Sequence, residues 1–220
     1  MSKDFLVMAS GKYINCAVDS PVTNVSSSSS DSNGSNSSNS SVGKQPYRLY
    51  RFLTDLENIL DQVKSDELRL KRIFPLVRRL LTESDWLQGE FREPDPDLGW
   101  SVLTLYEEPD FPLTVQTVVW LPGRHSPIHN HGTWGVVAVI NGAERNRFWH
   151  RSPEPKHPDR IELVDERVLV PGEIIGFTPE AIHSVEVIGE TPTVTFNLYG
   201  ETDFQQRFEF DPVTHQATGF

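Results

Sequence analysis

The sequence predicts an all-β barrel or sandwich behind an N-terminal helical cap, with a Ser/Asn-rich tail in front of both. Residues 26–41 read SSSSSDSNGSNSSNSS, which offers no apolar side chains to a core. Residues 49–63 place apolar side chains three and four positions apart, the spacing of one helix face. After residue 97, short runs rich in Val, Thr and aromatic residues are separated by Pro, Gly, Asn and Asp turns, as in all-β domains.

The 220 residues divide where the composition and the spacing of apolar residues change. We expect residues 1–45 to be a disordered tail, residues 46–92 a helical cap and residues 93–220 a β-barrel. Residues 46–220 are expected to form one folded unit. The three Lys and three Asp of the tail cancel, so the net charge of −11 belongs to the folded part.

Charge and cysteine content exclude several classes of function. An acidic folded part without a basic block is repelled by phosphate backbones and anionic lipids, so we expect no nucleic-acid and no membrane partner. No run approaches the roughly 18 apolar residues of a membrane helix. The single cysteine, Cys16, excludes an intrachain disulfide framework and a multi-cysteine zinc site. We predict a cytoplasmic monomer or small homo-oligomer that acts on a small molecule.

The cap is predicted to contain two main helices. The first carries the apolar stripe from Leu49 to Val63. Ser65-Asp66-Glu67 supplies a cap and an acidic first turn for the second, which we expect Pro75 to break or restart before it ends near Thr82. Ser84-Asp85-Trp86 predicts one further short turn.

Strands are predicted for the rest of the chain, separated by turn residues at near-regular intervals. They cover residues 101–106, 114–121, 134–140, 145–150, 160–170, 173–177, 184–187, 193–199 and 206–210.

The residues best suited to chemistry lie between Pro122 and Gly135. His129 and His131 are two positions apart, so on a strand their imidazoles point to the same face. Two imidazoles on one face offer two adjacent ligands to a divalent metal ion. A pair of surface histidines in a turn has the same spacing, so this motif alone leaves both interpretations open.

The wider pattern resembles the first motif of the cupin superfamily, at the spacing of Gly123, His129, His131, Gly135 and Gly142. Gly135 stands where that motif usually has a glutamate ligand. The resemblance implies a jelly-roll barrel, also called a double-stranded β-helix, and one more histidine from a second motif. His183, which follows the Pro171-Gly172 turn, supplies it.

Three histidines without an acidic ligand resemble the thiol dioxygenases of the cysteine dioxygenase type, in their bacterial form. This resemblance implies Fe²⁺ bound by His129, His131 and His183. It also implies oxidation of a small thiol, cysteine-like or a mercaptocarboxylate, by O₂ to its sulfinate. Of the family's serine–histidine–tyrosine row, which falls on Thr195, Asn197 and Tyr199, we expect Tyr199 to be catalytic.

Other positions depart from the family. Vertebrate-type members link a cysteine to the tyrosine, and here Gly135 excludes that link. The strand where relatives place an Arg or Gln for the substrate carboxylate reads SVLTL at 101–105. A cation for an anionic substrate must therefore come from elsewhere. The candidate substrate-binding residues are Arg124, Arg145, Arg147 and Trp134.

Two alternative functions remain open at this stage. Three imidazoles and a water are also a ligand set of zinc enzymes. A cupin that binds a metal or small ligand without turnover is favoured by Asn197, which cannot shuttle a proton as histidine can. The missing carboxylate-binding residue favours it too.

Overall fold

The computed structural model describes residues 3–16, 46–108 and 113–219. The helical elements are α1 (Leu49–Gln62), α2 (Asp66–Glu83) and the short 3-10 helix η1 (Asp85–Gly89). The strands are β1 (Asp4–Val7), β2 (Tyr13–Cys16), β3 (Trp100–Glu108), β4 (Leu113–Trp120), β5 (Ile128–His129), β6 (Gly135–Asn141), β7 (Ala143–Arg151), β8 (Ile161–Leu169), β9 (Ile174–Phe177), β10 (Ile182–Ile188), β11 (Thr193–Tyr199), β12 (Phe208–Asp211) and β13 (Gln216–Gly219).

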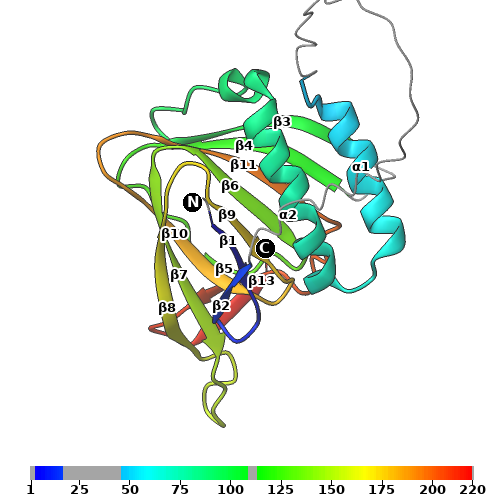
Figure 1. Ribbon diagram of the computed structural model, residues 1–220. Coiled ribbons are helices and arrows are strands. Elements are labelled where there is room, and N and C mark those ends of the chain that lie inside the picture. The colour runs from blue at the N-terminus through cyan, green and yellow to red at the C-terminus, as the bar shows by residue number, and fades with distance from the viewer. Residues whose placement is uncertain (1–2, 17–45, 109–112, 220) are drawn as a thin grey trace, which may run out of the picture.

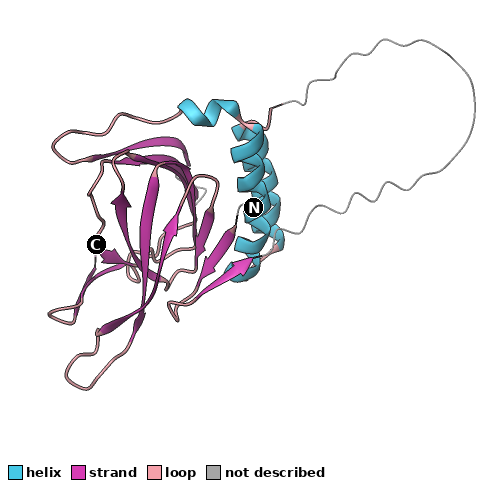
Figure 2. Cartoon of the chain, turned by 60° about the vertical axis from the view of Figure 1, so that its left-hand side comes forward, coloured by secondary structure: helices cyan, strands magenta, loops and turns pink. Residues whose placement is uncertain are grey.

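Two sheets form the barrel (Figures 1 and 2). One has the order β2-β1-β9-β6-β11-β4-β3 and the other the order β13-β12-β5-β10-β7-β8. Within strands β4 to β11, the first sheet holds β4-β11-β6-β9 and the second β5-β10-β7-β8, with every neighbouring pair antiparallel. This alternation between sheets is consistent with the predicted jelly-roll barrel.

The N-terminal hairpin corrects the prediction of a tail over residues 1–45. β1 pairs in parallel with β9 and antiparallel with β2, and Phe5, Leu6 and Val7 are at most 1% exposed. Residues 4–16 therefore belong to the barrel, because their short apolar run completes a sheet. The Ser/Asn-rich part of the predicted tail lies outside the described residues.

The helices cover the outer face of the first sheet, as Figures 1 and 2 show. Strand alternation sends Val136, Ala138, Phe196 and Leu198 toward them, into one buried apolar cluster. α2 continues through Pro75, contrary to the predicted break. Pro75 is exposed, and the buried residues on both sides of it hold the helix against the sheet.

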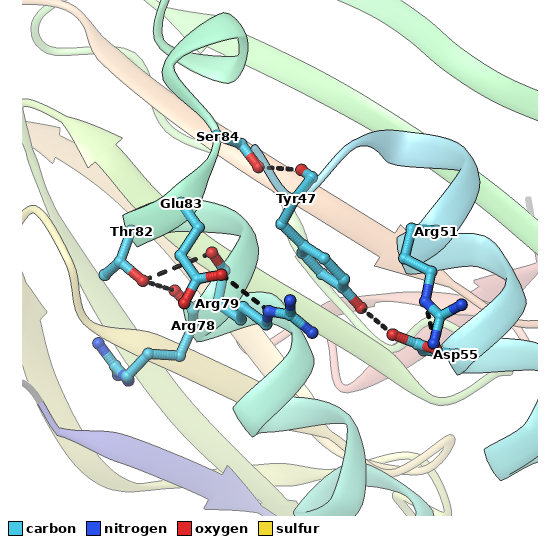
Figure 3. A network of polar contacts seen from close by, with 8 residues as sticks. All are labelled: Tyr47, Arg51, Asp55, Arg78, Arg79, Thr82, Glu83 and Ser84. Atoms are coloured by element: carbon cyan, nitrogen blue, oxygen red, sulfur yellow. Dashed lines mark hydrogen bonds and ion pairs between the residues drawn. The ribbon is translucent and has the colours of Figure 1, made fainter. Parts of the chain in front are cut away.

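Polar contacts fix the start of α1 against the end of α2 (Figure 3). The Tyr47 hydroxyl donates to the Asp55 carboxylate at 2.7 Å. The backbone N–H of Tyr47 donates to the Glu83 carbonyl at 2.9 Å. The Ser84 hydroxyl donates to the Tyr47 carbonyl. The Arg79 guanidinium lies 4.0 Å from the centre of the Tyr47 ring. Together these contacts hold the helical pair in one arrangement.

The inward faces of the strands divide the barrel interior in two. Val137, Val139, Phe148, Ile175 and Phe177 fill one part with apolar side chains. Polar side chains from β7, β10 and β11 gather in the other part, where the candidate site lies. Within the described ranges, no helix combines the length and apolar character needed to cross a bilayer.

Candidate metal centre

The structure brings the three predicted ligand histidines together. His129 is on β5, His131 follows it, and His183 on β10 pairs directly with His129. One ring nitrogen from each lies within 4.8 Å of the others. The Nε2 atoms of His131 and His183 are 3.0 Å apart.

The distance between His131 and His183 suits two ligands of one divalent metal ion. Two ligands about 2.1 Å from one ion and at right angles to each other are about 3.0 Å apart. Within the described residues, no carboxylate or thiol joins the group. The donor set is therefore all imidazole, which suits Zn, Cu, Fe and Ni ions and leaves the metal charge uncompensated by the protein.

The environment keeps the imidazoles in the neutral form that binds metal. Burial lowers the pKa of all three, most strongly for His131 and His183. The charge of His129 lowers the pKa of His131 and His183 further. Because only neutral imidazole has a free ring lone pair, the site is ready for metal at neutral pH.

Hydrogen bonds orient two of the rings. Nδ1 of His129 lies 3.0 Å from the Pro127 carbonyl oxygen, and Nδ1 of His183 lies 3.2 Å from the Asn146 side-chain oxygen. Each oxygen can only accept, so each Nδ1 carries the proton and donates. The lone pair is then on Nε2, which in His183 is the atom 3.0 Å from Nε2 of His131.

Asn130, between the two histidines of the motif, points away from them and is buried. Its side chain donates to the carbonyl oxygens of Pro179 and Gln206 at 3.2 and 2.7 Å. It accepts from the Phe208 backbone N–H at 2.8 Å. These bonds tie three segments behind the site. Strand alternation, which sends residue 130 away from the ligand face, is the signal that could have predicted this.

Thr195, Asn197 and Tyr199 form the predicted row on one face of β11. The Tyr199 hydroxyl donates to Asn197 at 3.1 Å, and the Asn197 amide donates to the Thr195 hydroxyl at 2.8 Å. The Tyr199 ring centre is 4.8 Å from that of His131. Burial, followed by the nearby Glu144, raises the pKa of Tyr199, so the phenol keeps its proton at neutral pH.

A cavity of about 530 Å³ opens onto the histidines and Tyr199. Trp100 and Trp120 line it and stack on each other, with ring centres 6.0 Å apart. Gln116 brings an amide to the lining, on the strand beside the predicted carboxylate-binding strand. The cavity is the size of a small-molecule site, and both apolar and polar side chains line it.

Of the four predicted substrate-binding residues, Arg124 alone lines this cavity. Its guanidinium lies at the 97–99 turn and donates to the Asp97 carbonyl at 3.4 Å. Arg145 and Arg147 share a face of β7, as predicted, but it is the outer face. Both form ion pairs with Glu166 and Glu186. This corrects the expectation that these two arginines contact substrate.

Trp134 is also outside the cavity. It is 6% exposed and belongs to the apolar cluster beneath the helices. The Arg69 guanidinium lies 5.7 Å from the centre of its ring. Its indole packs so closely on Gly200 that a side chain at position 200 would overlap it. The expectation that Trp134 contacts substrate is therefore wrong, and Trp134 packs in the core instead.

Three charged residues of the cavity, Arg207, Glu144 and Glu209, were missed from the sequence. Arg207, half-buried before β12, lines the cavity, and its charge adds to the effect of burial in lowering the pKa of His129 and His131. Glu144 is 3% exposed, and burial raises its pKa to about 7. Glu144 shares the inner face of β7 with Phe148, and this alternation was the available signal.

No protein-family model matches the chain. Among solved structures, it is similar to a cupin superfamily protein from Desulfitobacterium hafniense, with 9% identity over 55% of this chain and 92% of that one, at a TM-score of 0.41. A Thermus thermophilus protein matches with 18% identity over 53% and 94%, at 0.41. Oxalate oxidase in complex with glycolate matches with 15% identity over 50% and 55%, at 0.36. Each of these structures matches about half of the chain. What the site can do chemically depends on the residues described above.

Proposed function

We propose that this protein is a non-haem, iron-dependent thiol dioxygenase that oxidises a small anionic thiol to its sulfinate. The observation that carries the proposal is the group of three neutral imidazoles beside Tyr199. Within the described residues, no carboxylate joins those ligands. A bound thiolate would then balance a metal charge that the protein leaves uncompensated.

Iron held by His129, His131 and His183 would supply the redox chemistry and favour the deprotonated thiol. The overall reaction is balanced without a further co-substrate. A thiol and one O₂ sum to a sulfinic acid: sulfur loses four electrons, both oxygen atoms accept them, and two S–O bonds replace the O–O bond.

The chain's own contribution begins with Tyr199. Its single hydroxyl hydrogen is donated to Asn197, so a hydrogen bond from Tyr199 to a substrate oxygen or sulfur atom beside the histidines would replace that bond. Asn197 and Thr195 hold that hydroxyl by the bonds described above. Since an amide cannot take up the proton as imidazole can, this row orients the phenol and does not relay protons.

Binding of the substrate carboxylate is assigned to Arg207. A guanidinium can bind a carboxylate through two hydrogen bonds. Arg207 lines the same cavity as the histidines, and its charge acts on them, whereas Arg124 lies at the 97–99 turn. Gln116, on β4 of the first sheet, adds an amide to the same cavity. The stacked Trp100 and Trp120 add apolar surface for the body of a small substrate.

The test combines metal analysis with oxygen uptake. Protein purified without metal supplementation is assayed for iron and zinc, and the iron-loaded form for O₂ consumption with cysteine, 3-mercaptopropionate and 2-mercaptoethanol. We expect one iron per chain, uptake with a carboxylate-bearing thiol, and a sulfinate product. His183→Ala should abolish uptake, whereas Arg145→Ala, on the outer face, should preserve it.

Other outcomes overturn the proposal in distinct ways. Zinc as the resident metal, with no thiol-dependent uptake after iron loading, supports a three-histidine zinc enzyme. Iron-loaded protein that binds thiols but turns over none of them supports a non-catalytic metal- or ligand-binding protein.

A further inference from the structure

A chain of three buried side chains connects the metal centre to β7. Glu144, Asn146 and His183 are 3%, 1% and 3% exposed. Glu144 and Asn146 share the inner face of β7, whose antiparallel pairing with β10 brings Asn146 beside His183. The Asn146 amide nitrogen donates to a carboxyl oxygen of Glu144 at 3.0 Å, and its oxygen lies 3.2 Å from Nδ1 of His183.

Glu144 determines which way the Asn146 amide faces. Burial raises the pKa of Glu144 to about 7, so above that pH the group is ionised, and an ionised carboxylate can only accept hydrogen bonds. If the amide were flipped, its oxygen would face a carboxyl oxygen and its NH₂ group would face His183. The arrangement observed, with NH₂ toward Glu144 and oxygen toward His183, satisfies both partners.

The amide orientation in turn determines where His183 carries its proton. An oxygen facing Nδ1 requires Nδ1–H, and the lone pair is then on Nε2, 3.0 Å from Nε2 of His131. A flipped amide would require the opposite tautomer, with the proton on the ligand atom. His129 has no such dependence, because its Nδ1 faces a backbone carbonyl that cannot flip.

We propose that Glu144 and Asn146 are positioning residues that hold His183 in the Nδ1–H tautomer and so keep its Nε2 available as a metal ligand. This inference rests on the proposed metal centre but not on thiol oxidation. A buried carboxylate is costly unless a hydrogen bond or charge compensates it. Here its one hydrogen bond within β7 orients the group that a ligand histidine depends on.

The decisive variant is Glu144→Gln, which has nearly the same shape. A glutamine can either accept from or donate to Asn146, so both amides can flip together and the tautomer of His183 is no longer fixed. In the double variant Glu144→Gln/Asn146→Asp, Nδ1 of His183 is again required to carry the proton. The new aspartate can only accept, from the glutamine on one side and from Nδ1–H of His183 on the other. The pair therefore exchanges amide and carboxylate while preserving the orientation.

Two measurements at pH 8 or above, where Glu144 is ionised, test the proposal. In metal-free protein, ¹⁵N-labelled histidine side-chain spectra should show His183 protonated on Nδ1 in wild type and in the double variant, and a mixture of tautomers in Glu144→Gln. Competition titration with Zn²⁺ and, without oxygen, Fe²⁺ should show affinity about 10- to 100-fold weaker in Glu144→Gln and restored in the double variant. Glu209→Gln is the matched control, because it removes another carboxylate of the same cavity wall.

Wild-type affinity together with an unchanged tautomer in Glu144→Gln would overturn the proposal. An equal loss of metal affinity in Glu209→Gln would also overturn it, because removal of any negative charge from the cavity would then explain the weaker binding. The proposal would also be overturned if Glu144→Gln weakened metal binding, the added Asn146→Asp did not restore it, and circular dichroism showed both variants to be folded. Neither measurement uses thiol or turnover, so failure of the dioxygenase proposal leaves this result intact.

Discussion

Tyr199 lies directly opposite Gly135 in the pairing of β11 with β6, and a Cβ atom at position 135 would come within 2.7 Å of two carbons of its ring. The glycine thus allows the phenol to lie flat against the neighbouring strand, beside His131. Any side chain at this position must push the ring away from its place.

Gly135→Ala is therefore expected to reduce thiol-dependent O₂ uptake about tenfold or more, because the Tyr199 hydroxyl is displaced. Metal content should stay at the wild-type level, since no ligand moves. Gly89→Ala is the matched control, because a Cβ there meets no neighbour within 4 Å. Full activity in Gly135→Ala would show that the position of Tyr199 does not matter.

Arg207→Ala should weaken the use of carboxylate-bearing thiols while sparing neutral ones. Loss of a guanidinium–carboxylate pair is expected to raise KM for 3-mercaptopropionate about tenfold or more, with little change for 2-mercaptoethanol. Arg145→Ala, whose guanidinium pairs with Glu186 on the outer face, should change neither. Steady-state O₂ uptake checks this, and an equal loss for both thiols would contradict it.

Metal binding is expected to resist mild acid. An ordinary imidazole takes up a proton near pH 6.5 and then competes with metal. Burial lowers the pKa of His129, His131 and His183, so this competition begins at lower pH. Zn²⁺ affinity, measured by chelator competition, should be nearly constant from pH 8 to 6.5. A steep fall within that range would mean that the rings titrate as if exposed.

Glu144 should make the metal-free protein less stable as pH rises. Burial raises its pKa from the usual 4.5 to about 7, so the folded state holds a proton that the unfolded state releases. Its contribution to the free energy of unfolding is full below pH 4.5 and is lost as pH rises through about 7, by up to about 3 kcal/mol.

Glu144→Gln removes this titration. Its free energy of unfolding relative to wild type, measured by urea unfolding with a chelator present, should increase between pH 5 and 8. A difference that is the same at every pH would contradict the prediction. The same substitution is expected to weaken metal binding, so stability and metal affinity should change in opposite directions.

Much of the barrel could be predicted from the sequence, because β-rich runs separated by turn residues carry a local signal. β11 begins and ends at the predicted residues, and the other eight predicted strands lie within about two residues of theirs. β1 could not be predicted in this way. Besides its hairpin partner β2, it is held in the barrel by β9, about 170 residues further along the chain.

The site was predictable where spacing alone decides the geometry. The two-residue separation of His129 and His131, and the row ending at Tyr199, are preserved in the structure. Which face of a strand points inward is a tertiary property. Arg145 and Arg147 were expected at the site, yet Glu144 and its neighbours on the other face of β7 point inward with Phe148.

The parallel pairing of β1 with β9 has a consequence for the order of events during synthesis. β1 leaves the ribosome long before residues 174–177 exist, so of its two strand partners it has only β2 until most of the barrel has been made. Contacts so distant along the chain form slowly, and apolar segments that wait for them are prone to aggregate. Pairing of the β1–β2 hairpin with β9 is therefore a late event, although β1 is made long before β9.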